Sequence, residues 1–410
     1  MLLTIAFLCV VSVFNIFIAR GLSYQLRSFF MIGVPLLICL VCLISFKFSN
    51  YFRILLLHTF IGIVLSLFFW EYRLIQSVSS RFENQKNISI ESPYEHITSN
   101  KEKVVFTTGE SIRRRYRLPF YKFGGKSFSN TVLCNEAGEL ISYKSDRYGF
   151  NNVDSKWDSD NPKIIILGDS FIHGICQSKG NSIADRLQSA NMDKDVINLG
   201  LSGNGILSNL GILSEYINEL NKVEKIIYFH YEGNDLSPNL ASELKRRELT
   251  NYLRGQTQDL INKQQDIDRI MQVHNDDAIK KISNPLNANI SFFRFSQLRE
   301  LISRSLDNMN INYDVFNDAL NIIIDKSKSL NSEFIFVYIP DSRSFENNRL
   351  HSSARTTVNN LVENKGLNYI NLYKTFRRSN SPLENYFFIG SHLSDKGSLN
   401  VVENIMHRYP

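Results

Sequence analysis

Five short, strongly apolar runs in the second part of this 410-residue chain constrain its fold more than any other feature. They are rich in β-branched residues and lie at 163–167, 196–199, 225–230, 333–339 and 369–372. Helical patterns follow the first two of them, at 182–190 and 202–216. Short buried strands that alternate with helices are typical of a parallel sheet covered on both faces, so we predict the α/β class.

The polar residues of this region cluster just after these predicted strands. Open parallel sheets bind ligands outside the carboxyl ends of their strands, so any site is expected there. Residues 131–143 contain further strand-like stretches, and a turn-rich segment with Gly149 follows at 145–152. A polar stretch at 241–275 interrupts the rhythm. It predicts an amphipathic helix, either solvated on the surface or acting as a cap over the site.

The first seventy residues form a separate compartment. Three runs there, 2–19, 29–46 and 54–70, are nearly free of charge and have lengths suited to crossing a bilayer. The first lacks the basic start and clear cleavage site of a signal peptide, so we predict three transmembrane helices. Basic residues flank both loops between the runs equally, so charge does not fix the topology. An odd number of spans places the two ends of the chain on opposite sides of the membrane.

These patterns predict three parts: a transmembrane anchor at 1–72, a membrane-proximal linker and lead-in at 73–130, and one large domain at 131–410 with a polar helical insertion at about 240–300. The formal net charge is +6, from 46 basic and 40 acidic residues. No basic run interleaved with aromatic residues would follow a phosphate backbone, so nucleic acid is not expected as a partner.

Two cysteines, Cys134 and Cys176, lie outside the apolar runs, and the other three lie within them. The pair is able to form one disulfide, which would fit an oxidising periplasmic or extracellular location. Two reduced, buried thiols are the alternative, since sequence does not show whether the Cα atoms approach within bonding range.

Ser170 lies three residues after the run at 163–167 and is a candidate nucleophile at the sheet edge. A serine hydroxyl needs a base to remove its proton and donors for the developing oxyanion. Four polar blocks along the chain supply these residue types: Gly168–Phe171 (GDSF), Asn198–Gly203 (NLGLSG), Gly233–Asp235 (GND) and Ser391–Ser394 (SHLS). In type and order they resemble the four blocks of the SGNH/GDSL hydrolase family.

This resemblance covers about residues 163–406 and implies a flavodoxin-like, three-layer α/β/α domain with a five-stranded parallel sheet. It also implies that His392 deprotonates Ser170, and that an oxyanion hole forms from the backbone N–H groups of Ser170 and Gly203 and the side-chain amide of Asn234. Glycine allows close backbone approach and the amide stays neutral, so neither a metal nor a cofactor is expected.

Asp169 and Asp235 are expected to support the site by bracing their own turns. His173 and His230 are alternative histidines, and His173 is expected to point along its helix. The sequence departs from the family at the aspartate that precedes the histidine by two or three residues, because Gly390 and Ile389 stand there. A backbone carbonyl, Glu384 or Asp395 is then left to orient the ring.

The expected function is that of a membrane-anchored SGNH-type serine esterase or O-acyl (acetyl) transfer protein. Its substrate would be an acylated cell-envelope polysaccharide or a similar ester, by analogy with SGNH domains behind membrane helices. We expect a multi-pass protein of the inner (cytoplasmic) membrane, with a periplasmic or extracellular catalytic domain. Acyl transfer would require a separate membrane acyl-donor transporter. The alternative is an inactive SGNH-fold protein that binds glycan or scaffolds an assembly.

Overall fold

The computed structural model describes residues 50–83, 103–134, 140–282, 311–347 and 351–410. The chain forms two compact units, one of residues 1–88 with 283–309 and the other of residues 89–282 with 310–410. In the first unit the described part is helix α4 (Asn50–Glu83). The second unit contains the five predicted strands and all four sequence blocks.

Helix α4 contains the third predicted span, 54–70, and the other two predicted spans lie outside the described residues. By length and mean hydropathy, none of the helices in the described ranges qualifies to cross a membrane. The three spans therefore stay a prediction. Several large apolar side chains of α4 are exposed, among them Leu65, Phe69 and Trp70.

The second unit is built on the predicted five-stranded sheet. Its strands are β4 (Lys163–Leu167), β5 (Asp195–Asn198), β6 (Val223–Tyr231), β7 (Glu333–Ile339) and β8 (Asn368–Asn371). They lie in the order β5-β4-β6-β7-β8, and every neighbouring pair is parallel. This is the flavodoxin-like strand order. Strand β5 lies on one side of β4 and strand β6 on the other, so the chain changes its direction of progress across the sheet after β5. The predicted parallel sheet is confirmed.

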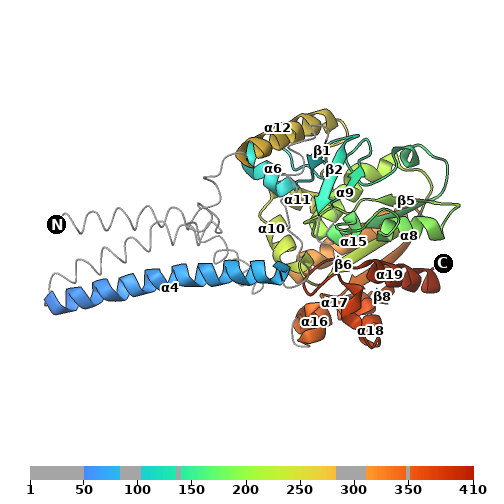
Figure 1. The fold of residues 1–410 in the computed structure, drawn as a ribbon. Helices are drawn as coiled ribbons and strands as arrows, with labels where there is room; N and C mark the ends of the chain where they lie inside the picture. The colour runs from blue at the N-terminus through green and yellow to red at the C-terminus, as the bar shows by residue number, and fades with distance from the viewer. Residues whose placement is uncertain (1–49, 84–102, 135–139, 283–310, 348–350) are drawn as a thin grey trace. The chain divides into compact units, whose positions relative to one another are not determined.

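Helices cover both faces of this sheet, so the predicted three layers are confirmed. Alternate residues of β4 point into two separate cores: Ile165 and Leu167 into one, Ile164 and Ile166 into the other. The first core is completed by α9 (Ile206–Tyr216), α15 (Tyr313–Ser329) and α17 (Ser352–Asn364), and the second by α8 (Ile183–Ala190), α18 (Leu372–Arg377) and α19 (Asp395–Arg408). Helix α9 packs on α15, and α8 packs on α19 (Figure 1).

A small second sheet precedes the large one along the chain. Strand β2 (Asn130–Cys134) pairs in parallel with β1 (Lys103–Val105) and antiparallel with β3 (Ile141–Lys144). Helix α6 (Gly109–Tyr116) follows β1, and its first turn is capped by Thr108, whose hydroxyl accepts the N–H of Ser111 at 3.4 Å. The segment predicted as linker and lead-in therefore contains β1 and α6.

The polar insertion forms several short helices and one longer one: η4 (Asp235–Leu240), α10 (Ala241–Glu243), α11 (Arg247–Thr250), η5 (Asn251–Arg254) and α12 (Gln264–Ile282). Helix α12 lies beside the small sheet (Figure 1). Its Asp268 accepts the N–H of Ser127 at 2.8 Å, and its Asn275 accepts the N–H of Val105 at 3.2 Å. Part of the polar face of α12 therefore binds the lead-in segment. One of the two expectations, a helix solvated on the surface, does not hold for that part.

The remaining elements are short and join the larger ones. They are η2 (Asp154–Trp157), α7 (Ser170–His173), η3 (Ile217–Glu219), α16 (Arg343–Glu346) and η6 (Pro382–Asn385). Helix α7 matters most here, because it begins directly after β4 at the edge of the sheet where parallel strands end.

Candidate active site

Ser170 is the first residue of α7, in a tight turn at the end of β4. Asp169 caps this short helix, since its Oδ1 accepts the N–H of Phe171 at 3.0 Å. Gly168 is needed for the turn, because a Cβ there would lie 2.5 Å from Cγ1 of Ile172. The buried strand and capped turn leave Ser170 half-buried at the sheet edge.

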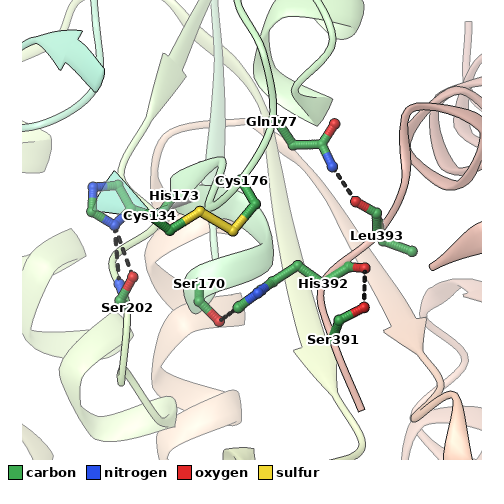
Figure 2. Close-up of a disulfide and its surroundings, with 9 residues drawn as sticks. All are labelled: Cys134, Ser170, His173, Cys176, Gln177, Ser202, Ser391, His392 and Leu393. Carbon is green, nitrogen blue, oxygen red and sulfur yellow. Dashed lines mark hydrogen bonds between the residues drawn. A yellow bond between two sulfur atoms is a disulfide. The ribbon is translucent and has the colours of Figure 1, made fainter. Parts of the chain in front are cut away.

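His392 lies next to Ser170. Its Nε2 is 2.9 Å from Oγ of Ser170, a distance at which the hydroxyl donates to an unprotonated imidazole nitrogen (Figure 2). The two residues are 222 positions apart, and each comes from a predicted sequence block. The ring of His392 also packs 5.1 Å, between centroids, from that of Phe171.

Hydrogen bonds from three directions hold the loop that carries His392. Within the loop, Oγ of Ser391 accepts the N–H of Phe388 at 2.7 Å. From the turn after β7, Oγ of Ser342 accepts the N–H of Gly390 at 2.7 Å. From the segment after α7, the amide of Gln177 donates to the backbone carbonyl of Leu393 (Figure 2).

Gly203 and Asn234 follow the strands that flank β4 in the sheet, β5 and β6. The Gly203 loop contacts the turn that carries Ser170, because the N–H of Leu201 donates to the carbonyl of Gly168 at 3.2 Å. Gly203 has φ +83°, in the region that favours glycine, and a Cβ there would lie 3.2 Å from Cγ2 of Thr108. Oδ1 of Asn234 is buried and has no hydrogen-bond partner among the described residues.

Two buried carboxyl groups lie behind these residues. Asp169 Oδ2 is 3.4 Å from Oγ of Ser170, and burial raises the pKa of Asp169 to about 7, with a further contribution from the charge of Asp235. Burial also raises the pKa of Asp235, whose Oδ2 accepts the N–H of Tyr231 at 2.8 Å. Each carboxyl group therefore braces its own turn, Asp169 the start of α7 and Asp235 the end of β6.

The two acids suggested for orienting His392 bond to other groups. Glu384 pairs with Lys396 on the surface, and Asp395 accepts a hydrogen bond from the amide of Asn181 at 3.0 Å. Among the residues that the structure describes, no group of three His, Cys, Asp or Glu side chains is arranged to hold a metal ion.

The alternative histidines are both buried and directed elsewhere. His173 Nδ1 lies 3.0 Å from Oγ of Ser202, so its side chain does not point along α7 as expected (Figure 2). His230 packs its ring 5.3 Å from that of Phe316, and its Nδ1 is 3.4 Å from Oδ2 of Asp235. Burial lowers the pKa of His230 to about 4.

One supporting residue had no signal in the sequence. Glu243, in the polar insertion, is buried against the start of α9, where its carboxylate accepts the N–H groups of Gly205, Leu207 and Ser208 at 2.7 to 3.0 Å. It therefore caps a helix whose own N-cap, Gly205, has no side chain to do so. A single Glu among many charged residues gives no sign of such a contact.

Cys134 and Cys176 form a disulfide, with a distance of 5.5 Å between their Cα atoms. It joins the end of β2 in the small sheet to the segment that follows α7 (Figure 2). Gln177, the next residue, donates a hydrogen bond to the His392 loop. The disulfide thus fixes a segment between Ser170 and that loop.

Solved structures with a similar arrangement include a member of the lipolytic G-D-S-L family from Veillonella parvula, with 10% identity, a TM-score of 0.34, and coverage of 60% of this chain and 97% of that chain. A lipase/acylhydrolase from Enterococcus faecalis is 17% identical, with a TM-score of 0.36 and coverage of 60% of this chain and 94% of that chain. No curated protein sequence matches this chain.

The model of one protein family, GDSL-like lipase/acylhydrolase, matches residues 164–405, more than half of the chain. The match starts within β4, ends within α19 and so includes all four sequence blocks. The chain belongs to the GDSL-like lipase/acylhydrolase family, whose members are acylhydrolases and esterases.

Proposed function

We propose that the protein is a serine esterase that works through an acyl-enzyme on Ser170. The observation that carries this proposal is the 2.9 Å distance between Oγ of Ser170 and Nε2 of His392. As Oγ attacks the carbonyl carbon of an ester, its proton passes to Nε2 and the carbonyl oxygen becomes an oxyanion. The C–O bond to the alcohol then breaks, and the alcohol leaves with the proton from His392.

Water completes the reaction by the same route. It gives a proton to His392 while its oxygen attacks the acyl carbon, and the acid leaves as Ser170 recovers its proton. We assign the oxyanion donors to the N–H groups of Ser170 and Gly203 and to the amide of Asn234. Ser170 suits this role as the first residue of α7, since the first N–H groups of a helix have no partner within it.

We further propose that the protein is anchored in the inner membrane, with its catalytic domain on the outer side. The support is the three apolar runs of the sequence and the exposed apolar side chains of α4. The disulfide between Cys134 and Cys176 supports an oxidising compartment. An acylated cell-envelope polysaccharide is the substrate that such a location favours, and acyl transfer would need a membrane partner that supplies the acyl donor.

A second candidate is a catalytically silent protein that binds glycan or scaffolds an assembly. It is motivated by Ile389 and Gly390, which stand where the family carries an orienting aspartate before the histidine. In this case the fold and the serine–histidine contact would persist without turnover.

Measuring acetate release and glycan binding in parallel separates the two candidates. Full-length protein in detergent is given an O-acetylated polysaccharide, and wild type is compared with Ser170→Ala and Asn234→Ala. An esterase releases acetate as wild type, loses release in Ser170→Ala, and slows by about 10²-fold in Asn234→Ala while binding is retained. Binding without acetate release in wild type would favour the second candidate.

A further inference from the structure

His173 connects the helix of the nucleophile to the loop of Gly203. It lies three residues after Ser170, at the last position of α7, and its side chain is fully buried. Its Nδ1 contacts Ser202 twice, at 3.0 Å from Oγ and 3.3 Å from the backbone nitrogen. Its Nε2 is 3.1 Å from the hydroxyl of Tyr143, on strand β3 of the small sheet.

These partners determine where the proton of the ring lies. The backbone N–H of Ser202 is only a donor, so Nδ1 must accept and therefore carries no proton. The proton of the neutral ring is then on Nε2, which donates to the hydroxyl of Tyr143. That hydroxyl in turn donates to the carbonyl of Gly149 at 3.4 Å. In this series of hydrogen bonds, from Ser202 through His173 and Tyr143 to Gly149, each donor meets an acceptor.

The surroundings of His173 keep its ring neutral and fixed. Phe106 and Tyr143 pack against it edge-on, with centroid distances of 4.5 and 5.5 Å. Burial lowers the pKa of His173 to about 3, and the nearby positive charge of Lys122 contributes to this shift. Nδ1 therefore remains an acceptor for Ser202 at neutral pH. A ring held in this way cannot also serve as the base for Ser170.

We infer that His173 is a positioning residue for the oxyanion donor Gly203, an inference that rests on the proposed function. The peptide of Ser202 is fixed by His173, and that of Leu201 by the carbonyl of Gly168. The next N–H along the chain is that of Gly203, in a conformation with φ +83° that the loop must hold. Through Tyr143, the small sheet becomes part of the support of the site.

Two substitutions separate the two bonds of His173. In His173→Asn the Asn carbonyl oxygen takes the place of Nδ1 and can accept from Ser202, whereas the contact with Tyr143 is lost. In His173→Gln the longer amide reaches towards Tyr143, whereas the acceptor for Ser202 is lost. We expect kcat of His173→Asn within about threefold of wild type, and kcat of His173→Gln at least about tenfold lower with KM unchanged.

Two controls keep the inference open to refutation. Tyr252→Phe removes a buried hydrogen bond at 2.7 Å to Glu215 away from the loop, and it should lower the Tm without lowering kcat. Tyr143→Phe removes the acceptor of the Nε2 proton, and it should lower kcat by a few-fold with KM unchanged even if His173→Gln fails to fold.

Equal kcat values in wild type, His173→Gln and Tyr143→Phe would overturn the inference. So would losses of kcat that follow the Tm in every variant, Tyr252→Phe included. If Ser170→Ala kept the turnover of wild type, the proposed function itself would fail. That result is distinguishable, because it does not depend on His173.

Discussion

The two loops that flank Ser170 are held in different ways. The Gly203 loop is fixed by buried titratable side chains, His173 on one side and Glu243 at the start of α9 on the other. The His392 loop is fixed by neutral hydroxyl and amide groups, and its neighbours Ile389 and Gly390 are exposed. Changes in the His392 loop should therefore affect turnover more than folding, and changes around the Gly203 loop should affect both.

Removing the base should have the largest effect on turnover. We predict that His392→Ala lowers kcat by at least about 10³-fold, because Ser170 then lacks the imidazole that takes its proton. The free energy of unfolding should change little, since the ring is only half-buried. His407→Ala, an exposed histidine on α19, is the matched control and should keep wild-type kcat. Steady-state kinetics and urea unfolding measure both quantities, and a His392→Ala variant with wild-type kcat would contradict the prediction.

Removing an oxyanion donor should lower kcat less than removing the base does. Asn234→Ala removes the amide that we assign to the oxyanion, and we predict a loss of about 10²-fold in kcat with KM unchanged. The exposed Asn380→Ala is the control. A rise in KM with unaltered kcat would instead assign Asn234 to ground-state binding.

Removing the disulfide tests how much this cross-link stabilises the domain. Replacing Cys134 and Cys176 together by serine should lower the free energy of unfolding by about 2 to 4 kcal/mol, because the unfolded chain loses a cross-link. Thermal unfolding of this variant should match that of wild type treated with reductant. A variant with the Tm of untreated wild type would show that the remaining contacts suffice.

A substitution of Glu243 tests how the Gly203 loop and the start of α9 are held. Glu243→Gln replaces one acceptor oxygen by an NH₂ group that faces backbone N–H donors, so we predict a loss of about 1 to 3 kcal/mol in stability. Glu224→Gln removes a surface charge paired with Lys194 and should change stability by less than about 0.5 kcal/mol. Equal stability of the two variants would mean that the cap on α9 contributes nothing.

The smallest predicted effect is on pH dependence. Burial lowers the pKa of His173 from 6.5 to about 3, so between these values the unfolded state binds a proton that the folded state does not. Stability from this group is therefore present above pH 6.5 and lost as pH falls. Between pH 7 and pH 5, wild type should lose about 1 to 2 kcal/mol more than His173→Asn. Urea unfolding at both pH values gives this difference, and identical losses would contradict it.

The sequence was most informative where the physics is local. The run at 163–167 is apolar and β-branched, and it forms β4 with the same bounds. The predicted helix at 182–190 begins one residue later, at Ile183, because Ser182 is its cap. Strand β1 was not predicted, since three residues paired in parallel give no alternation of polar and apolar positions.

The residues of the candidate site were named from the resemblance of four sequence blocks to the SGNH/GDSL family, and of these Ser170 and His392 lie within hydrogen-bond distance. Because each block is a short motif of fixed residue types, its residues could be named from the sequence alone. The supports of the site could not, because His173, Tyr143 and Glu243 depend on contacts between segments 30 or more residues apart. Such contacts are set by tertiary packing, which leaves no periodic trace in the sequence.

The central claim, that His392 activates Ser170, is tested most directly by covalent labelling. Full-length protein in detergent is treated with a fluorophosphonate, and mass spectrometry locates the adduct in wild type, Ser170→Ala and His392→Ala. The account predicts an adduct on Ser170 of wild type, none in Ser170→Ala, and labelling slowed by at least about 10²-fold in His392→Ala. A folded wild-type protein that stays unlabelled, or one labelled equally fast without His392, would contradict it.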